Sequence, residues 1–148
     1  MPVAKRIAKA DSAAGQVTCG TGVCDPQSTQ GLKAPAPKAT HSLVSLDGPG
    51  LFLSANVTKQ GGPTGLTFVK LEIDGRTVVD LSYAAARNFG LSSPNPYGIQ
   101  LLNGVGIESF AMGWPVPLTF KRSLKLSATV NETGVVQIIG TVIHASSG

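Results

Sequence analysis

The chain has 148 residues, and only 14% of them are charged, against about 25% in ordinary soluble domains. This length predicts one domain, and no apolar run approaches the ~20 residues that a membrane-spanning helix needs. Charged residues this few are not enough to make the whole surface of a monomer hydrophilic. We therefore expect part of the exterior to be buried against other chains, in an oligomer or a lattice.

Residues 1–45 are predicted to form an extended arm. Glycine and proline interrupt every apolar pattern in this stretch, so it has no core of its own. The arm holds most of the net charge of +4 and contributes five basic residues, which are Lys5, Arg6, Lys9, Lys33 and Lys38. These cations suit contacts with neighbouring subunits. Contact with nucleic acid is a weaker expectation, because no aromatic residue lies among the first three of them to stack on bases. The first ten residues lack the apolar region of a secretory signal, which predicts synthesis in the cytoplasm.

Cys19 and Cys24 flank a short glycine-containing segment of the arm. Three interpretations are open: a small disulfide loop, two reduced thiols, or half of a metal site with His41 as a further ligand. The spacing is not the usual zinc spacing, there is no second cysteine pair, and the only other histidine is His144. The disulfide is therefore the candidate that we carry forward, with no metal and no cofactor.

Residues 46–148 are predicted to form an antiparallel β-sandwich, of jelly-roll or immunoglobulin type. Short strands separated by turn signals are typical of that fold. The expected strands cover residues 51–57, 66–73, 76–81, 99–102, 107–112 and 116–120, with Asp74-Gly75 as a hairpin turn. One short helix is expected over residues 82–89, because Ser82 or Asp80 can cap its start and Gly90 its end.

The clearest predicted hairpin joins residues 123–130 to residues 135–143. Its first strand alternates apolar and polar side chains, and its second is apolar on both faces, which is typical of a central strand. Residues 131–134 have the composition of a tight turn.

No candidate for catalysis emerges from the chain. The carboxylates Glu72, Asp74, Asp80 and Glu108 are not clustered as calcium loops or glycosidase pairs require, and no nucleotide-binding or hydrolase motif occurs. Trp114, Tyr97 and Phe110 are candidates for an aromatic platform that stacks on sugar rings, although a lone tryptophan in a small sandwich is more often part of the core. We therefore expect a protein that is not an enzyme.

The chain combines a basic arm, residues 5–38, with a charge-poor, glycine-rich sandwich over residues 51–143. This architecture resembles small bacteriophage virion proteins of the coat-associated, decoration or vertex type. The resemblance is architectural. It implies a structural protein located in the virion, which binds copies of itself and other virion proteins such as a major capsid protein.

Three hypotheses follow from the sequence. The first is a virion building block whose arm laces neighbouring subunits together, so that deleting residues 1–40 leaves a folded sandwich that does not assemble. The second is a carbohydrate- or receptor-binding module of a phage fibre or spike. The third is a redox- or metal-regulated domain centred on Cys19 and Cys24.

Overall fold

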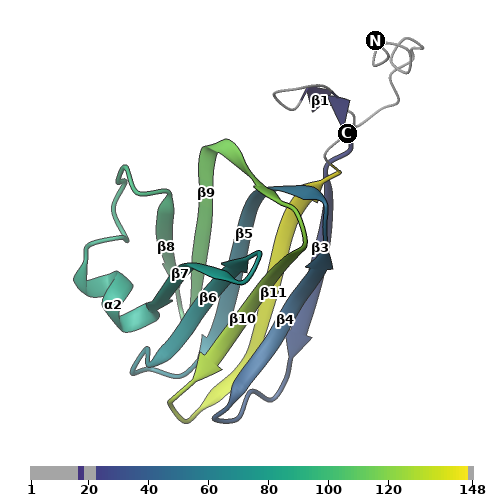
Figure 1. The fold of residues 1–148 in the computed structure, drawn as a ribbon. Coiled ribbons are helices and arrows are strands. Elements are labelled where there is room, and N and C mark those ends of the chain that lie inside the picture. The colour runs from purple at the N-terminus through teal and green to yellow at the C-terminus, as the bar shows by residue number, and fades with distance from the viewer. Residues whose placement is uncertain (1–16, 19–22, 147–148) are drawn as a thin grey trace.

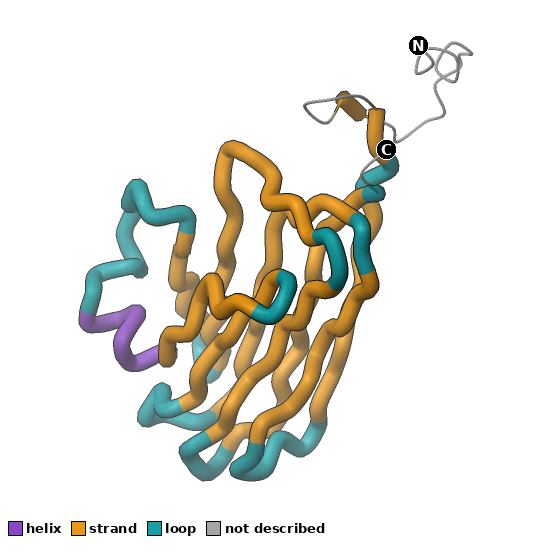
Figure 2. The backbone as a smooth tube through the Cα atoms, viewed as in Figure 1, coloured by secondary structure: helices purple, strands orange, loops and turns teal. Residues whose placement is uncertain are grey.

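The computed structural model describes residues 17–18 and 23–146. Within these residues the regular secondary structure is β-strand apart from one short helix, α2 (Tyr83–Asn88) (Figure 2). A small antiparallel pair, β1 (Val17–Thr18) and β2 (Val23–Cys24), precedes the main fold. The other strands are β3 (Gln27–Lys33), β4 (Thr40–Asp47), β5 (Gly50–Gly61), β6 (Thr67–Ile73), β7 (Arg76–Ser82), β8 (Ile99–Gly104), β9 (Ile107–Phe120), β10 (Ser123–Val130) and β11 (Val135–Ala145).

Two antiparallel sheets pack face to face as a sandwich (Figure 1). One sheet has four strands in the order β4-β10-β6-β7, and the other has five in the order β3-β11-β5-β9-β8. The expected all-β sandwich is thus confirmed, together with the Asp74-Gly75 hairpin between β6 and β7. Both turn residues have positive φ, 52° and 80°, as a two-residue turn between twisted strands favours.

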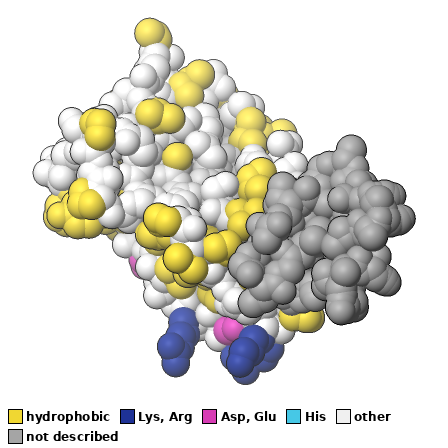
Figure 3. Space-filling model, turned by 90° about the horizontal axis from the view of Figure 1, so that it is seen from above, with side chains coloured by type: hydrophobic (Ala, Val, Ile, Leu, Met, Phe, Trp, Pro, Cys, Tyr) yellow, Lys and Arg dark blue, Asp and Glu magenta, His cyan; other side chains and the backbone are white. Residues whose placement is uncertain are grey.

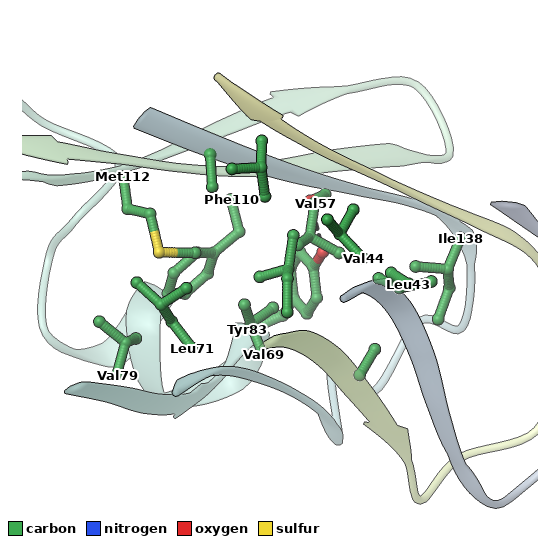
Figure 4. Packing of buried hydrophobic residues seen from close by; sticks show 14 of the residues in the cluster. Leu43, Val44, Val57, Val69, Leu71, Val79, Tyr83, Phe110, Met112 and Ile138 are labelled. Atoms are coloured by element: carbon green, nitrogen blue, oxygen red, sulfur yellow. Dashed lines mark hydrogen bonds between the residues drawn. The ribbon is translucent and has the colours of Figure 1, made fainter. Parts of the chain in front are cut away.

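Strand alternation builds the core between the sheets. The inward residues of β6 and β10 are all buried, and those of β5 and β9 meet them from the other sheet. Figure 4 shows Met112, Phe110 and Val57 facing Val79, Leu71 and Val69 across this core, with Tyr83 among them. Tyr83 is fully buried, and its hydroxyl donates a hydrogen bond to the carbonyl of Val57 at 2.6 Å.

Helix α2 connects the two sheets, because it follows β7 of one sheet and leads to β8 of the other. Ser82 caps its start as predicted, and the Ser82 hydroxyl accepts a hydrogen bond from the amide of Ala85 at 3.0 Å. Tyr83 and Ala86 are the buried residues of the helix. The helix lies at one side of the sandwich (Figure 1) and carries the buried Tyr83 at its start.

The predicted hairpin of residues 123–143 is wrong in its pairing. Both strands exist, but β10 pairs with β4 and β6 in one sheet, whereas β11 pairs with β3 and β5 in the other. Residues 131–134 therefore carry the chain from one sheet to the other. The physical reason is Glu132, whose buried side chain binds the β5–β6 connection and holds the chain in this crossing.

The expected division at residue 45 is also wrong. β3 forms one edge of the five-stranded sheet and β4 one edge of the four-stranded sheet, so residues 27–47 belong to the sandwich. Gly31 resembles a chain breaker in the sequence but lies inside β3, opposite Gly140. A Cβ on Gly31 would meet the carbonyl oxygen of Leu43 in β4 at 1.7 Å, so the close crossing of β3 and β4 requires glycine.

Candidate functional site

The outer face of the five-stranded sheet is the most unusual surface of the molecule. Register across the sheet places two rows of outward side chains over all five strands. One row is Gln30, Thr141, Asn56, Ala111 and Gln100, and the next is Leu32, Ile139, Thr58, Ser109 and Leu102. Neighbouring outward positions on the same strands hold Ser28, Gln137, Ile143, Ser54, Gln60, Ile107, Gly113 and Gly104. Among the described residues, no charged side chain stands on this outer face, which we call the neutral face.

The four-stranded sheet presents the opposite character to solvent. Its outward rows include Ser127, Lys70 and Asp80 side by side, and Lys125 beside Glu72. Lys70 and Glu72 form an ion pair at 3.8 Å. Charges of both signs are thus interspersed on this face, as on the surface of an ordinary soluble domain.

The neutral face is hollowed near its centre. The hollow has a volume of about 630 Å³, and small residues of β9 make its floor, since Gly113 lies opposite Ser54 and Ala111 lies opposite Asn56 of β5 there. A Cβ on Gly113 would come within 3.3 Å of the Ser54 side chain, so the hollow depends on that glycine. Its polar lining consists of neutral hydroxyl and amide groups, from Ser54, Asn56, Asn95, Gln100 and Thr141.

The structure does not form an exposed aromatic platform from the expected residues, because Phe110 is fully buried and Trp114 packs against the backbone next to Tyr97. Trp114 is half-buried, its indole Nε1 donates a hydrogen bond to the carbonyl of Tyr97 at 3.1 Å, and its ring packs 6.1 Å from that of buried Phe52. A Cβ on Gly98 would meet the indole at 2.4 Å, so the tryptophan is tightly packed against the loop of residues 91–98. Tyr97 itself is 66% exposed. Trp114 therefore holds this loop, and its ring is not a free stacking surface.

A buried cluster of charges, the Lys59 cluster, lies where β5 meets the sheet-crossing turn. Lys59 is 1% exposed, and its Nζ lies 3.4 Å from Glu132 Oε2 and 3.6 Å from Glu108 Oε1. Lys59 Nζ also donates a hydrogen bond to the carbonyl of Gly61 at 2.8 Å. Arg87 of α2 completes the cluster with a two-pronged contact to Glu108, in which Nε donates to Oε2 at 2.7 Å.

Glu132 is held as a carboxylate by three donors. Thr67 Oγ1 donates to Oε2 at 2.6 Å, Thr64 Oγ1 donates to Oε1 at 2.9 Å, and the amide of Gly65 donates to Oε1 at 3.0 Å. Burial alone would raise the pKa of Glu132, but these hydrogen bonds and the charge of Lys59 outweigh burial and lower the pKa below its usual value. Two cations and two carboxylates balance in the cluster, so its chemistry is that of a structural ion network.

Burial also acts on Tyr83, over whose ring Lys59 Nζ lies at 5.1 Å from the centroid. Desolvation, with the negative charges of Glu108 and Glu132, raises the pKa of Tyr83 far above its usual value, so the phenol stays neutral. Every buried side-chain nitrogen and oxygen among the described residues has a hydrogen-bond partner. No described group is therefore left buried and unpaired as a catalytic acid or base often is.

Sequence reasoning missed the importance of Lys59 and Glu132. Lys59 lies beyond the strand expected over residues 51–57, yet it continues the inward alternation of Ala55 and Val57 in β5. That alternation was the available signal. Glu132 gave none, because its partners lie more than sixty residues earlier in the chain.

Only some of the residues of the expected metal and disulfide sites are among the described residues. Among residues 17–18 and 23–146, no group of three or more His, Cys, Asp or Glu side chains is placed to hold a metal ion. His41 Nε2 donates to the carbonyl of Pro37 at 2.7 Å, and His144 is hydrogen-bonded to Thr29 at 2.8 Å. Cys19 lies outside the described residues and Cys24 lies in β2, so the disulfide stays a prediction.

Of the five basic residues assigned to the arm, only two are among the described residues. Lys5, Arg6 and Lys9 lie outside the described residues, whereas Lys33 ends β3 and Lys38 stands in the connection to β4, both exposed. The last two thus belong to the sandwich. In the described part of the chain, α2 is the only helix, and it is too short to cross a membrane.

No family model matches this chain, and a search of curated proteins finds no match. Function must therefore be argued from the surfaces themselves. Figure 3 shows the end of the molecule that points up in Figure 1, where the surface of the described residues is mostly backbone, uncharged polar side chains and hydrophobic side chains, and Lys and Arg gather at one edge.

Proposed function

We propose that this protein is a non-enzymatic structural building block that assembles with copies of itself through the neutral face. Its class is a capsid-associated or decoration protein of a bacteriophage virion, made in the host cytoplasm. The observation that carries the proposal is the contrast between the two outer faces of one sandwich. One face bears Lys70, Glu72, Asp80 and Lys125, and the other bears no charge among its described residues.

The contrast favours a covered neutral face for an energetic reason. A charged side chain costs free energy when it loses its water, and the centres of protein interfaces are depleted in lysine, glutamate and aspartate. Hydroxyl, amide and aliphatic side chains can be covered at a much smaller cost. A second copy of the chain offers the same uncharged side chains, so two neutral faces can meet without leaving a charge unpaired.

The size of the face is adequate for a specific contact. Five strands about 4.8 Å apart, with about four outward residues each, cover roughly 24 by 24 Å, or about 600 Å². A standard interface takes about 800 Å² from each partner. The neutral face alone is slightly below that value. The assembly arm expected from the sequence is the part of the proposal that would add to this area.

A matched pair of threonines tests the proposal. Thr141→Lys places a charge in the centre of the neutral face, and Thr129→Lys places the same charge on the outer face of the four-stranded sheet. We expect the native protein and the Thr129 variant to form the same oligomer by native mass spectrometry, and the Thr141 variant to be a folded monomer. A native protein that is monomeric at high concentration, or a Thr141 variant that assembles normally, would refute the role of this face.

The arm is tested by a truncation placed according to the structure. Removing residues 2–22 spares β3, whereas removing residues 1–40 takes away an edge strand and cannot be expected to leave the sandwich intact. We expect the shorter truncation to keep the circular dichroism spectrum of the sandwich and to lose assembly into larger particles in electron micrographs. Normal particles from this variant would remove the arm from the proposal.

The hollow favours a second candidate function, a carbohydrate-binding module. Its hydroxyl and amide groups match the hydroxyl groups of a neutral sugar, and its floor of Ala111, Gly113 and Ile143 suits an apolar sugar face. A screen of neutral oligosaccharides by glycan array tests this alternative. Binding that is lost in Asn56→Ala, while the oligomeric mass is unchanged, would favour the binding module over the building block.

A further inference from the structure

The turn that connects β9 to β10 is fastened to the β6–β7 hairpin by one carboxylate. Asp74 Oδ1 accepts hydrogen bonds from the amides of Arg122 at 2.7 Å and Ser123 at 3.0 Å, and Oδ2 accepts one from the amide of Lys121 at 2.9 Å. The amide of Asp74 donates in return to the carbonyl of Ser123 at 2.9 Å. The two turns therefore form one rigid unit.

Three exposed cations project from this unit around a hollow. Arg76, Lys121 and Arg122 line it, together with Ile73, Asp74 and Thr119, and its volume is about 460 Å³. None of the three cations is ion-paired with another residue in the described part of the chain, whereas Lys59, Lys70 and Arg87 all have carboxylate partners. The guanidinium of Arg122 donates only to the backbone carbonyl of Asp74, at 3.1 Å.

The carboxylate of Asp74 leaves these cations available. The three backbone hydrogen bonds lower the pKa of Asp74 to about 2, so the group is ionised at neutral pH. Its oxygens are engaged by amides and do not bind the side chains of Arg76 or Lys121. The hollow keeps a net charge of +2 and three side chains that are good donors to oxyanions.

We propose that this hollow, the Arg76–Lys121–Arg122 site, binds phosphate groups of a nucleic-acid backbone. It goes beyond assembly through the neutral face, because it uses different residues and a different ligand. The sequence suggested a nucleic-acid contact only for the arm. The structure supplies a second set of cations, held by a rigid backbone on the sandwich itself.

The lining also indicates how nucleic acid would be bound. No aromatic side chain lines the hollow, so bases have nothing to stack on. Contacts would go to phosphates alone, and they would be independent of base sequence and strongly dependent on salt. The overall net charge of +4 adds a favourable long-range field.

The test is the salt dependence of binding to a short duplex DNA, measured by fluorescence anisotropy with the full-length chain. Each phosphate contact contributes about 0.9 to the slope of log K against log salt. We expect the triple variant Arg76→Gln, Lys121→Gln, Arg122→Gln to reduce the slope by about 3 × 0.9, that is by roughly 2.7. The single variant Lys121→Gln should reduce it by about 0.9 and keeps all three hydrogen bonds of Asp74.

A matched triple variant distinguishes the loss of contacts at the Arg76–Lys121–Arg122 site from the loss of overall positive charge. Lys33→Gln, Lys38→Gln, Lys70→Gln removes three positive charges outside the hollow, from exposed Lys33 and Lys38 and from half-buried Lys70, and it should leave the slope near that of the native chain. Equal losses in both triple variants would overturn the proposal in favour of a charge effect without a site. Binding to vesicles of anionic phospholipid but not to DNA, or an unchanged slope in the first triple variant, would also overturn it.

Discussion

At each end of β10 a carboxylate accepts three hydrogen bonds, but the cations near the two carboxylates are arranged differently. At the end near Ser123, the carboxylate of Asp74 accepts three backbone amides. At the end near Val130, the carboxylate of Glu132 accepts two threonine hydroxyls and one amide. Each carboxylate ties a turn next to β10 to a distant segment of the chain, and together they fix both ends of a central strand.

The difference lies in where the cations go. Around Glu132 they are inside the protein, because Lys59 is buried between two carboxylates and Arg87 covers Glu108. Around Asp74 they point outward and are unpaired among the described residues. The buried end therefore determines how the chain crosses between the sheets, while the exposed end has charge available for a ligand. Substitutions at the two ends should accordingly affect different measurements.

The largest loss of stability is expected from Glu132→Gln. This change removes one buried negative charge and leaves Lys59 with less compensation, and breaking a buried ion pair on one side costs about 3–5 kcal/mol. Urea unfolding followed by circular dichroism measures the free energy of unfolding. A loss below about 1 kcal/mol would show that the sheet crossing does not depend on this carboxylate.

A double-mutant cycle refines that expectation. Lys59→Met removes the buried cation, and its cost should partly disappear when Glu132→Gln is already present, because the two side chains interact directly. Additive losses would indicate that Lys59 acts through its bonds to the carbonyls of Gly61 and Gly62 instead.

The two ends also mark how far the sequence could predict the fold. Alternation in residues 123–130 predicts β10 closely, and the strand expected over residues 66–73 contains β6. The Asp74-Gly75 turn pairs β6 with β7 as expected. Alternation is a local property, however, and it does not determine which strand is the partner. Residues 131–134 have the composition of a hairpin turn, and only the three donors supplied by residues 64–67 reveal that Glu132 is buried in a sheet crossing.

The same limit applies to the edge strands and to the neutral face. An irregular arm was the natural prediction from Gly31, Pro35 and Pro37, because the conformational preferences of glycine and proline can be read from the sequence. The close approach of the Leu43 backbone to Gly31 cannot be read from the sequence. Low charge led to the expectation of a contact surface without a position. The neutral face, which we propose for that role, could not be located from the sequence, since its rows of neutral side chains exist only once five strands from across the chain are in register.

A smaller loss is expected from Tyr83→Phe in the core beside the Lys59 cluster. The change removes the hydroxyl that donates to the carbonyl of Val57 and keeps the ring in its edge-on contact with Phe110. Leaving a buried acceptor without its donor costs about 1–3 kcal/mol. Thermal unfolding should show a lower midpoint with an unchanged near-ultraviolet spectrum, and a midpoint equal to that of the native protein would contradict this role of the hydroxyl.

The Asp74 end should be recognisable by its pH dependence. The folded-state pKa of about 2 lies below the ordinary value of 3.8, so the ionised carboxylate contributes stability above about pH 4, and this contribution is lost as the pH falls toward 2. Asp74→Asn should therefore lower the unfolding midpoint at pH 7, and the gap to the native protein should close between about pH 4 and pH 2. A gap that is constant over this range would mean that the charge of Asp74 is not the stabilising feature.

The smallest effect on stability is expected from the cations at the exposed end. Arg76→Gln and Lys121→Gln change exposed side chains that have no ion-pair partner among the described residues, so each should alter the free energy of unfolding by less than about 0.5 kcal/mol. The same two variants should weaken binding to DNA. If they destabilised the fold as Glu132→Gln does, the exposed cations would be structural like those of the Lys59 cluster, and the distinction between the two ends of β10 would fail.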